Sequence, residues 1–402
     1  YIFRRIKITS EVLKQKIRFL RNSASSISAS FAFDKSYELY MDIIKPVESI
    51  IKDVKHLNIV TDGSLQSIPF SILLTNNNHI SYLSNDKLQV NSFTRGISGV
   101  AKAIEKSDDP NKYDIYRNAD WLMNKYSISY IPSISSFKYL RDNVKGKNII
   151  TKRHRFIGFG SPLIGNAYAK NDKFEIENSD FIVSLNMRGM SFDQNEIIKL
   201  PELPETANEL LSISKILGSS SKSVFLGQEA TETNLKALDL SKYDIIAFAT
   251  HGLMANEITG VDEPSLVLTP PSKPSALDDG LLTSSEISQL KLNADWVILS
   301  ACNTAASDGT PGAEGFSGLT KSFFYAGARS LLVSHWPVAS EATVELTTNM
   351  FEEMRIDPDL GKSEALRRSR LKLINDSNNP EYAHPFYWAP FVVVGEGNSL
   401  RQ

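Results

Sequence analysis

The sequence predicts an α/β fold built on a mostly parallel β-sheet. From about residue 204 onward, short apolar segments alternate with helical segments, the order that places helices on both faces of a parallel sheet. Two of the apolar segments, 243–250 and 296–302, are almost continuously hydrophobic, as expected for strands buried on both sides. We therefore expect a central sheet between two layers of helices.

The first 200 residues are expected to begin with helices and to hold only short strands. Apolar residues near the start recur every three or four positions, the spacing of helices with one buried face. The expected elements are helices at 11–21 and 37–51, strands at 57–60, 66–74 and 155–160, a helix and a long loop within 98–126, and a helix from Ser133 to about residue 144. Residues 164–200 are polar and are expected to form an extended insertion.

The second half has the more regular pattern. The expected strands are 223–226, 243–250, 265–268, 296–302, 330–334 and 391–394, and the expected helices are 204–217, 231–238, 315–326, 340–354, 362–375 and one that starts near Thr283. Local signals support two of the helix ends. Thr283 and Glu286 have the spacing of a capping box, and Gly218 follows the last apolar residue of its helix.

Composition limits the function classes. The net charge is −2, with 42% hydrophobic and 22% charged residues, so the chain offers no basic surface for nucleic acid or membrane. A single cysteine excludes an intramolecular disulfide and suits a reducing cytoplasm, which is the expected location. No apolar stretch approaches the roughly 18 residues of a membrane span. Because the first residue is Tyr1, we expect a fragment or a processed product.

His251 and Cys302 are candidates for a catalytic pair because each ends a predicted buried strand. Reactive groups of open α/β sheets lie beyond the carboxyl ends of their strands. A thiolate is the attacking species, and an imidazole within hydrogen-bond reach can take the thiol proton and later return it to a leaving amine. The alternative for this cysteine is core packing, since cysteine is among the most often buried residue types.

Two backbone N–H groups, those of Gly252 and Cys302, are candidates for an oxyanion hole, whose donors face the negative charge that develops during acyl transfer. No cofactor is expected, because the chain lacks a phosphate-binding loop and Gly158-Phe159-Gly160 has no third glycine at the dinucleotide spacing. No metal site is expected either. The other histidines show no metal-ligand spacing: His56, His79, His154 and His384.

Several stretches together make the chain resemble the CHAT-domain peptidases, relatives of caspases and separases. Thr250-His251-Gly252 and Leu299-Ser300-Ala301-Cys302-Asn303-Thr304 resemble the catalytic blocks of that family. Further matching stretches are 39–46, 57–70, 130–133, 279–287, 314–328, 334–338 and 385–391. The 51 residues between His251 and Cys302 also match the separation of about 50 that is typical of caspases.

The resemblance implies a cysteine endopeptidase with His251 as base and Cys302 as nucleophile. It also implies a caspase-like three-layer sandwich preceded by a degenerate caspase-like half. The expected division is an N-terminal helical segment at 1–34, the end of a helical repeat array, then a pseudo-caspase half with a polar insertion at 35–200 and a catalytic half at 201–402. Such proteins commonly act in bacterial defence or signalling, where a regulatory protein partner releases the protease onto a protein substrate.

Substrate preference is the least specified property. Ser300 stands two residues before the cysteine, where relatives that cut after basic residues often carry an acid, so no specificity is transferred. Asp278, Asp279 and Glu314 are candidates to line a substrate pocket, against the alternative of solvated loop carboxylates. His335 is a candidate substrate contact or helper base, against the alternative of a packed or solvent-facing loop residue.

The sequence therefore predicts a cytoplasmic cysteine endopeptidase that acts on a protein or peptide substrate through His251 and Cys302. Direct binding to nucleic acid or to membranes is not expected. The alternative function is a non-catalytic caspase-like regulatory or interaction module that presents the same surface to a partner. An activated thiolate reacts quickly with electrophiles and a buried structural thiol does not, so thiol labelling separates the two.

Overall fold

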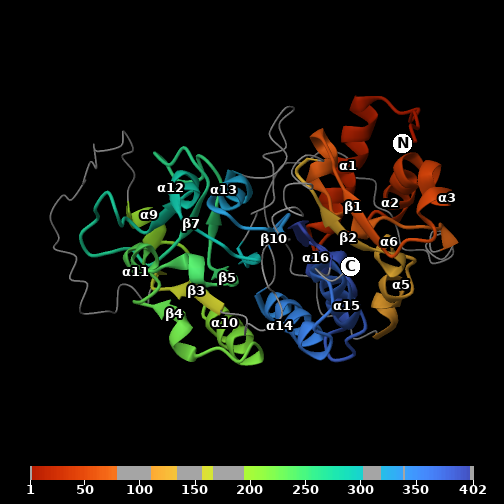
Figure 1. Ribbon diagram of the computed structural model, residues 1–402. Coiled ribbons are helices and arrows are strands. Elements are labelled where there is room, and N and C mark those ends of the chain that lie inside the picture. The colour runs from red at the N-terminus through yellow and green to blue at the C-terminus, as the bar shows by residue number, and fades with distance from the viewer. Residues whose placement is uncertain are drawn as a thin grey trace.

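A central β-sheet runs through the computed structural model, which describes residues 2–78, 110–133, 156–165, 194–301, 318–337 and 340–398 (Figure 1). Its eight described strands follow the order β1-β2-β11-β10-β9-β5-β3-β4. They are β1 His56–Ile59, β2 Ser127–Tyr130, β3 Phe156–Pro162, β4 Val224–Gly227, β5 Ile245–Ala249, β9 Trp296–Leu299, β10 Ser330–Ser334 and β11 Phe391–Gly395. Each neighbouring pair is parallel except β10 and β11, so the predicted mostly parallel sheet is confirmed.

Helices cover both faces of the sheet. In Figure 1, α10, α14 and α15 lie along one face, and α12 and α13 lie on the other, next to a small antiparallel sheet of order β6-β7-β8. The bounds are α10 Glu205–Ile216, α12 Ser284–Gln289, α13 Gly318–Ala326, α14 Ser340–Ile356, α15 Lys362–Ile374, β6 Gly252–Leu253, β7 Ser265–Val267 and β8 Leu281–Thr283. This arrangement confirms the predicted three-layer α/β fold.

The remaining described helices are short, apart from the N-terminal one. They are α1 Ser10–Ala24, α2 Phe33–Leu39, α3 Glu48–Ile51, α5 Asp114–Arg117, α6 Leu122–Lys125, α9 Gln194–Ile198, α11 Glu232–Ala237 and α16 Pro385–Trp388. Helix α1 packs on α2, and Figure 1 places both near β1. Among the described helices, none is long and apolar enough to cross a membrane.

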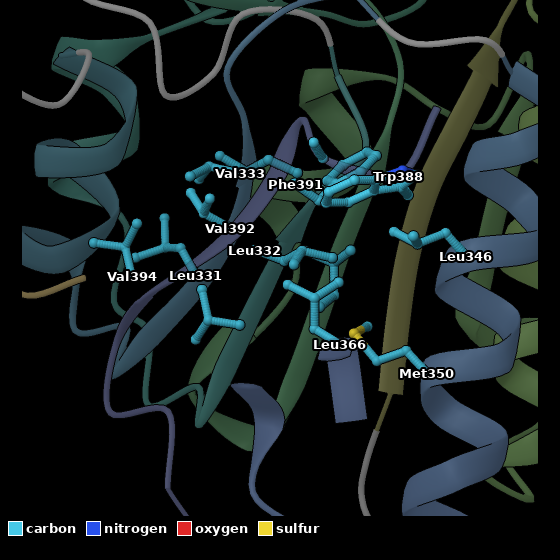
Figure 2. Packing of buried hydrophobic residues seen from close by; sticks show 14 of the residues in the cluster. Leu331, Leu332, Val333, Leu346, Met350, Leu366, Trp388, Phe391, Val392 and Val394 are labelled. Carbon is cyan, nitrogen blue, oxygen red and sulfur yellow. The ribbon is translucent and has the colours of Figure 1, made fainter. Parts of the chain in front are cut away.

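The main core forms where the apolar strands meet the helices on both faces of the sheet. Every residue of β5, β9, β10 and β11 is buried, which explains their unbroken hydrophobic runs. Figure 2 shows Leu346 and Met350 of α14 turned toward Leu332 of β10 and Leu366 of α15. Removing such apolar surface from water contributes about 25 cal/mol per Å², so this packing holds the central strands in place.

Local helix signals in the second half are confirmed. The Thr283 side chain accepts a hydrogen bond from the Glu286 N–H, and the Glu286 carboxylate accepts one from the Thr283 N–H, which completes the capping box. At the start of α11, the Thr231 side chain accepts a hydrogen bond from the Asn234 N–H. Gly218, after α10, has a φ of +64°, a left-handed conformation that glycine adopts without steric cost.

One predicted strand is wrong, and three described strands were not predicted: β2, β6 and β8. Residues 66–74 form two 3₁₀ turns, Gly63–Ser67 and Phe70–Ile72, because Pro69 lacks an N–H for a strand ladder. Strand β2 was missed since its four residues alternate serine with apolar side chains and give only a short signal. The helix expected from Ser133 to 144 and most of the expected insertion lie outside the described residues.

Strands from both expected halves share one sheet. β1, β2 and β3 come from residues 35–200, and β3 lies between β5 and β4 of the second half. The expected boundary near residue 200 therefore separates segments that pair with each other. A degenerate caspase-like origin of the first segment stays a prediction.

Candidate active site

The strands that lead to His251 and Cys302 are adjacent and parallel. β5 pairs with β9 up to Phe248 opposite Leu299, and the Ser300 N–H donates to the Phe248 carbonyl at 2.9 Å. His251 lies three residues past Phe248, and Cys302 lies three residues past Leu299. Both residues therefore follow the same edge of the sheet. Cys302 lies outside the described residues, as does Glu314, so the distance between imidazole and sulfur stays a prediction.

The imidazole of half-buried His251 is held by a backbone carbonyl. Its Nε2 lies 2.8 Å from the carbonyl oxygen of Pro201. A carbonyl can only accept a hydrogen bond, so Nε2 carries the proton and donates it. In the neutral ring the other nitrogen, Nδ1, is then the one with a free lone pair. The contact therefore selects the tautomer in which Nδ1 can act as a base.

The contact between His251 and Pro201 has no signature in the sequence. Every residue has a backbone carbonyl, so no residue type signals this role. The contact depends on where the chain passes between α9 and α10, which is a tertiary feature. A cavity of about 700 Å³ adjoins the same segment and is lined by Gly165, Ile198, Lys199, Leu200, Pro201 and Glu202.

The backbone around His251 is fixed by the small sheet. The Thr250 hydroxyl donates to the Val267 carbonyl at 2.5 Å, and the Val267 N–H donates to the His251 carbonyl at 2.9 Å. Gly252 stands opposite Leu266 in the antiparallel ladder between β6 and β7. Because the bond from Val267 flanks that pair, Gly252 occupies a non-bonded position and its N–H points away from β7. This orientation leaves the N–H open to another acceptor.

Glycine at position 160 allows β3 to approach the end of β5 closely. A Cβ added there would lie 2.7 Å from the Ala249 carbonyl oxygen and 2.6 Å from Leu210 Cδ1. Ala249 is two residues before His251. We expect Gly160→Ala to lower the free energy of unfolding by about 1–3 kcal/mol, because the backbone of β5 must shift.

Gly158→Ala is the matched control for this prediction. It adds a Cβ in the same strand whose nearest neighbours are side-chain atoms of Leu210 and Phe156, at 3.0 Å or more. Urea unfolding of both variants would show the larger loss for Gly160→Ala. Equal losses of unfolding free energy in the two variants would contradict the prediction that the end of β5 specifically requires glycine at position 160.

Ser300, two residues before Cys302, hydrogen-bonds to a buried carboxyl group. Its hydroxyl donates to Glu209 Oε1 at 2.6 Å, and the Thr347 hydroxyl donates to the same oxygen at 3.0 Å. Burial and, to a smaller extent, the charge of nearby Glu205 raise the pKa of Glu209 to about 7, against the lowering effect of the two hydroxyls. Neither Glu209 nor Thr347 was singled out from the sequence.

Asp278 and Asp279 close the loop that precedes β8. Asp278 is 6% exposed, and its Oδ2 accepts hydrogen bonds from the N–H and the hydroxyl of Thr233. The N–H groups of Asp279 and Gly280 donate to Glu232 Oε1 at 2.9 and 3.0 Å. Burial raises the pKa of Glu232 to about 8. These contacts order the loop, and a substrate-binding role for the two aspartates stays a prediction.

His335 is enclosed in the core at the end of β10. Its side chain is 1% exposed, and neither ring nitrogen has a hydrogen-bond partner among the described residues. Burial, followed by the charges of Arg21 and Arg370, lowers the pKa of His335 to about 3. In this conformation the imidazole of His335 is neutral and is not open to a ligand. A contact between His335 and a substrate would need a different conformation and stays a prediction.

Among the described residues, there is no group of three or more His, Cys, Asp or Glu side chains that could hold a metal ion.

Comparison with known families identifies the chain. The profile of the CHAT domain matches residues 34–396, which is most of the sequence. The chain belongs to the CHAT domain family. The resemblance inferred from the His251 and Cys302 blocks is thus confirmed.

Other matches are more distant. This CHAT protein is 28% identical over 125 residues to tetratricopeptide repeat protein 28 of Mus musculus, a match that covers 30% of this chain and 5% of that protein. Among solved structures, the arginine-specific cysteine proteinase gingipain R has a TM-score of 0.45 at 10% identity, covering 96% of this chain and 74% of that chain. The Saccharomyces cerevisiae separase–securin complex has a TM-score of 0.39 at 13% identity, covering 72% of this chain and 15% of that one.

Proposed function

We propose that this CHAT protein is a cysteine endopeptidase in which Cys302 is the nucleophile and His251 is the base. The observation that supports it most directly is the hydrogen bond from His251 Nε2 to the Pro201 carbonyl, at the edge of the sheet to which β9 leads. A base held by a third group within reach of a nucleophile is the arrangement that activates a thiol.

The proton path follows from the tautomer. Nδ1 of His251 takes the proton of the Cys302 thiol, and the thiolate sulfur attacks the carbonyl carbon of a peptide bond. The N–H groups of Gly252 and Cys302 donate to the oxyanion that forms. The imidazolium then returns its proton to the leaving amine, which breaks the C–N bond and leaves a thioester. Water, deprotonated by His251, hydrolyses the thioester and restores the thiol.

The orienting group in this proposal is a carbonyl and not a carboxylate. The Pro201 carbonyl fixes the ring and stabilises the imidazolium by one hydrogen bond, but it brings no full negative charge. Charge-assisted bonds to carboxylates are roughly twice as strong as neutral ones. The His251 ring is therefore held by a weaker hydrogen bond than a ring that is paired with an aspartate.

Substrate selection is proposed to involve the loop that carries Asp278 and Asp279, together with Glu314 and His335. Asp278 and Asp279 are already engaged in hydrogen bonds, and His335 is enclosed. A substrate side chain would have to displace those contacts. The proposed substrate is a protein or peptide, and no residue preference is assigned.

A protein partner is proposed to regulate the enzyme, in a bacterial defence or signalling setting in the cytoplasm. We expect the isolated chain to cleave peptide substrates weakly. A partner that binds better to the conformation with an ordered substrate pocket would increase the fraction of molecules in that conformation and so raise activity. Amides of Asp279 and Gly280 should already be protected from hydrogen exchange, since both donate to Glu232. Residues 303–314 are where exchange should slow on activation.

Measuring cleavage alone and with candidate partners, alongside hydrogen exchange, tests the regulatory proposal. Full activity of the purified chain, with 303–314 already protected, would contradict it.

The alternative is a non-catalytic interaction module with the same fold. Alkylation distinguishes the two, because the chain has one cysteine and every modified molecule reports on Cys302. An activated thiolate would react with iodoacetamide at pH 7 faster than a free thiol of ordinary pKa, about 8.5. A rate below that of free cysteine would favour the module. Cleavage-site profiling of wild type against Cys302→Ala would then identify the substrate.

A further inference from the structure

Glu209 is a buried acid with no cationic partner in the part of the chain that the structure describes. It lies on α10, is 1% exposed, and makes no ion pair with a described lysine or arginine. Its Oε1 accepts hydrogen bonds from Ser300 at 2.6 Å and Thr347 at 3.0 Å. Burying a carboxyl group carries a desolvation cost that an apolar residue on the same helix face, such as Leu210, avoids. Stability alone therefore gives little reason for an acid at this position.

The hydrogen bond to Ser300 acts on the segment that leads into Cys302. Ser300 and Ala301 are held from three elements: the Ser300 N–H by Phe248 of β5, the Ser300 hydroxyl by Glu209, and the Ala301 carbonyl by the Ser334 hydroxyl of β10 at 2.7 Å. Consecutive Cα atoms are about 3.8 Å apart, so Cys302 begins one residue beyond this fixed point.

We propose that Glu209 is a positioning residue that, through Ser300, fixes the backbone from which the Cys302 thiol is presented to His251. The proposal rests on the proposed function in that Cys302 is taken as the nucleophile. Small displacements at a reacting group are costly, since a misplacement of about 1 Å can lower a rate by about 100-fold.

Two single substitutions provide a matched test. Ser300→Ala and Thr347→Val each remove one hydroxyl donor from the same oxygen of Glu209, but only Ser300 lies in the segment between β9 and Cys302. The readout is the alkylation rate of the single cysteine by iodoacetamide from pH 5.5 to 9, with thermal unfolding measured in parallel. We expect Ser300→Ala to slow alkylation at pH 7 by on the order of tenfold. Thr347→Val should stay within about twofold, the result for a donor that does not touch the strand.

Substitutions of Glu209 itself provide a rescue test. Glu209→Gln keeps an oxygen that accepts from Ser300 and removes the charge, so its alkylation rate should equal or exceed that of wild type. Glu209→Leu keeps the approximate volume and removes the acceptor, so it should match Ser300→Ala. If Ser300→Ala fails to fold, the comparison of Gln with Leu carries the test, because both change Glu209 and only one retains the acceptor.

Equal effects of Ser300→Ala and Thr347→Val would overturn the proposal, as would a Glu209→Leu variant that reacts like wild type. An effect that follows only the loss of thermal stability would overturn it too. Alkylation needs no substrate, so the outcome is separate from peptidase activity. If Ser300→Ala slows alkylation as expected but wild type cleaves no protein, the proposed function fails and the positioning role stands.

Discussion

Cys302→Ala and His251→Ala are each expected to reduce peptide cleavage by about 10³-fold or more, the scale seen when one member of a catalytic unit is removed. Without the thiol there is no nucleophile to form the thioester. Without the imidazole the thiol stays largely protonated near pH 7 and the leaving amine receives no proton. The double variant should be no slower than either single one, because residues that act as a unit are not additive.

The control for this prediction is stability. His251 is half-buried, and its side chain makes one hydrogen bond with the described residues, to Pro201, so thermal unfolding of His251→Ala should change little. Thiol alkylation adds a second readout, since His251→Ala should slow labelling of Cys302 at pH 7 while leaving its rate at pH 10 close to wild type. Cleavage by Cys302→Ala within a few-fold of wild type would contradict the mechanism.

Local patterns were sufficient to predict most of the second half of the fold. The apolar runs of β5, β9 and β10 and the amphipathic spacing of α10, α14 and α15 are properties of single segments, which is why they could be predicted. The reversal of direction between β10 and β11 was not predicted, because pairing between distant strands leaves no mark in either segment. In 66–74 the apolar residues indicate a strand, but Pro69 has no N–H to donate to a strand ladder, and the segment forms 3₁₀ turns.

Some residues of the candidate site are indicated by local sequence patterns, and others depend on tertiary structure. His251 and Gly252 could be placed from the sequence since reactive groups follow strand ends. The Pro201 carbonyl could not, because its role comes from tertiary placement. Glu209 did leave a signal. It lies on the same helix face as Leu210 and Ile213, where an acid is out of place unless a polar partner is buried with it.

His335→Phe is expected to become more stable than wild type as the pH falls. Burial, together with the charges of Arg21 of α1 and Arg370 of α15, lowers the pKa of His335 to about 3. Below the unfolded value of about 6.5, the unfolded chain binds a proton that the folded chain excludes, so wild type loses about 1.4 kcal/mol of stability per pH unit from this group. The loss continues until the pH reaches about 3.

Phenylalanine fits this position because both imidazole nitrogens lack a described partner, so the substitution breaks no described hydrogen bond. The ring of Tyr130 lies 6.4 Å from the His335 ring and Trp336 lies 6.3 Å away, which is an aromatic environment. Any difference in packing adds a constant to the unfolding free energy, whereas titration changes its slope with pH. At pH 4.5 the titration alone should favour His335→Phe by about 3 kcal/mol over its value above pH 7.

Glu209→Gln supplies the opposite slope and so an internal check. Burial raises the pKa of Glu209 to about 7, so wild type loses stability as the pH rises from about 4.5 to 7, and the glutamine variant does not. In wild type the two groups change the free energy of unfolding in opposite directions as the pH falls. The difference between each variant and wild type isolates one group, and urea midpoints at pH 4.5, 6, 7 and 8.5 would measure these differences. Parallel curves for His335→Phe and wild type would show that His335 titrates freely and is therefore open to solvent, and a substrate contact at His335 would regain support.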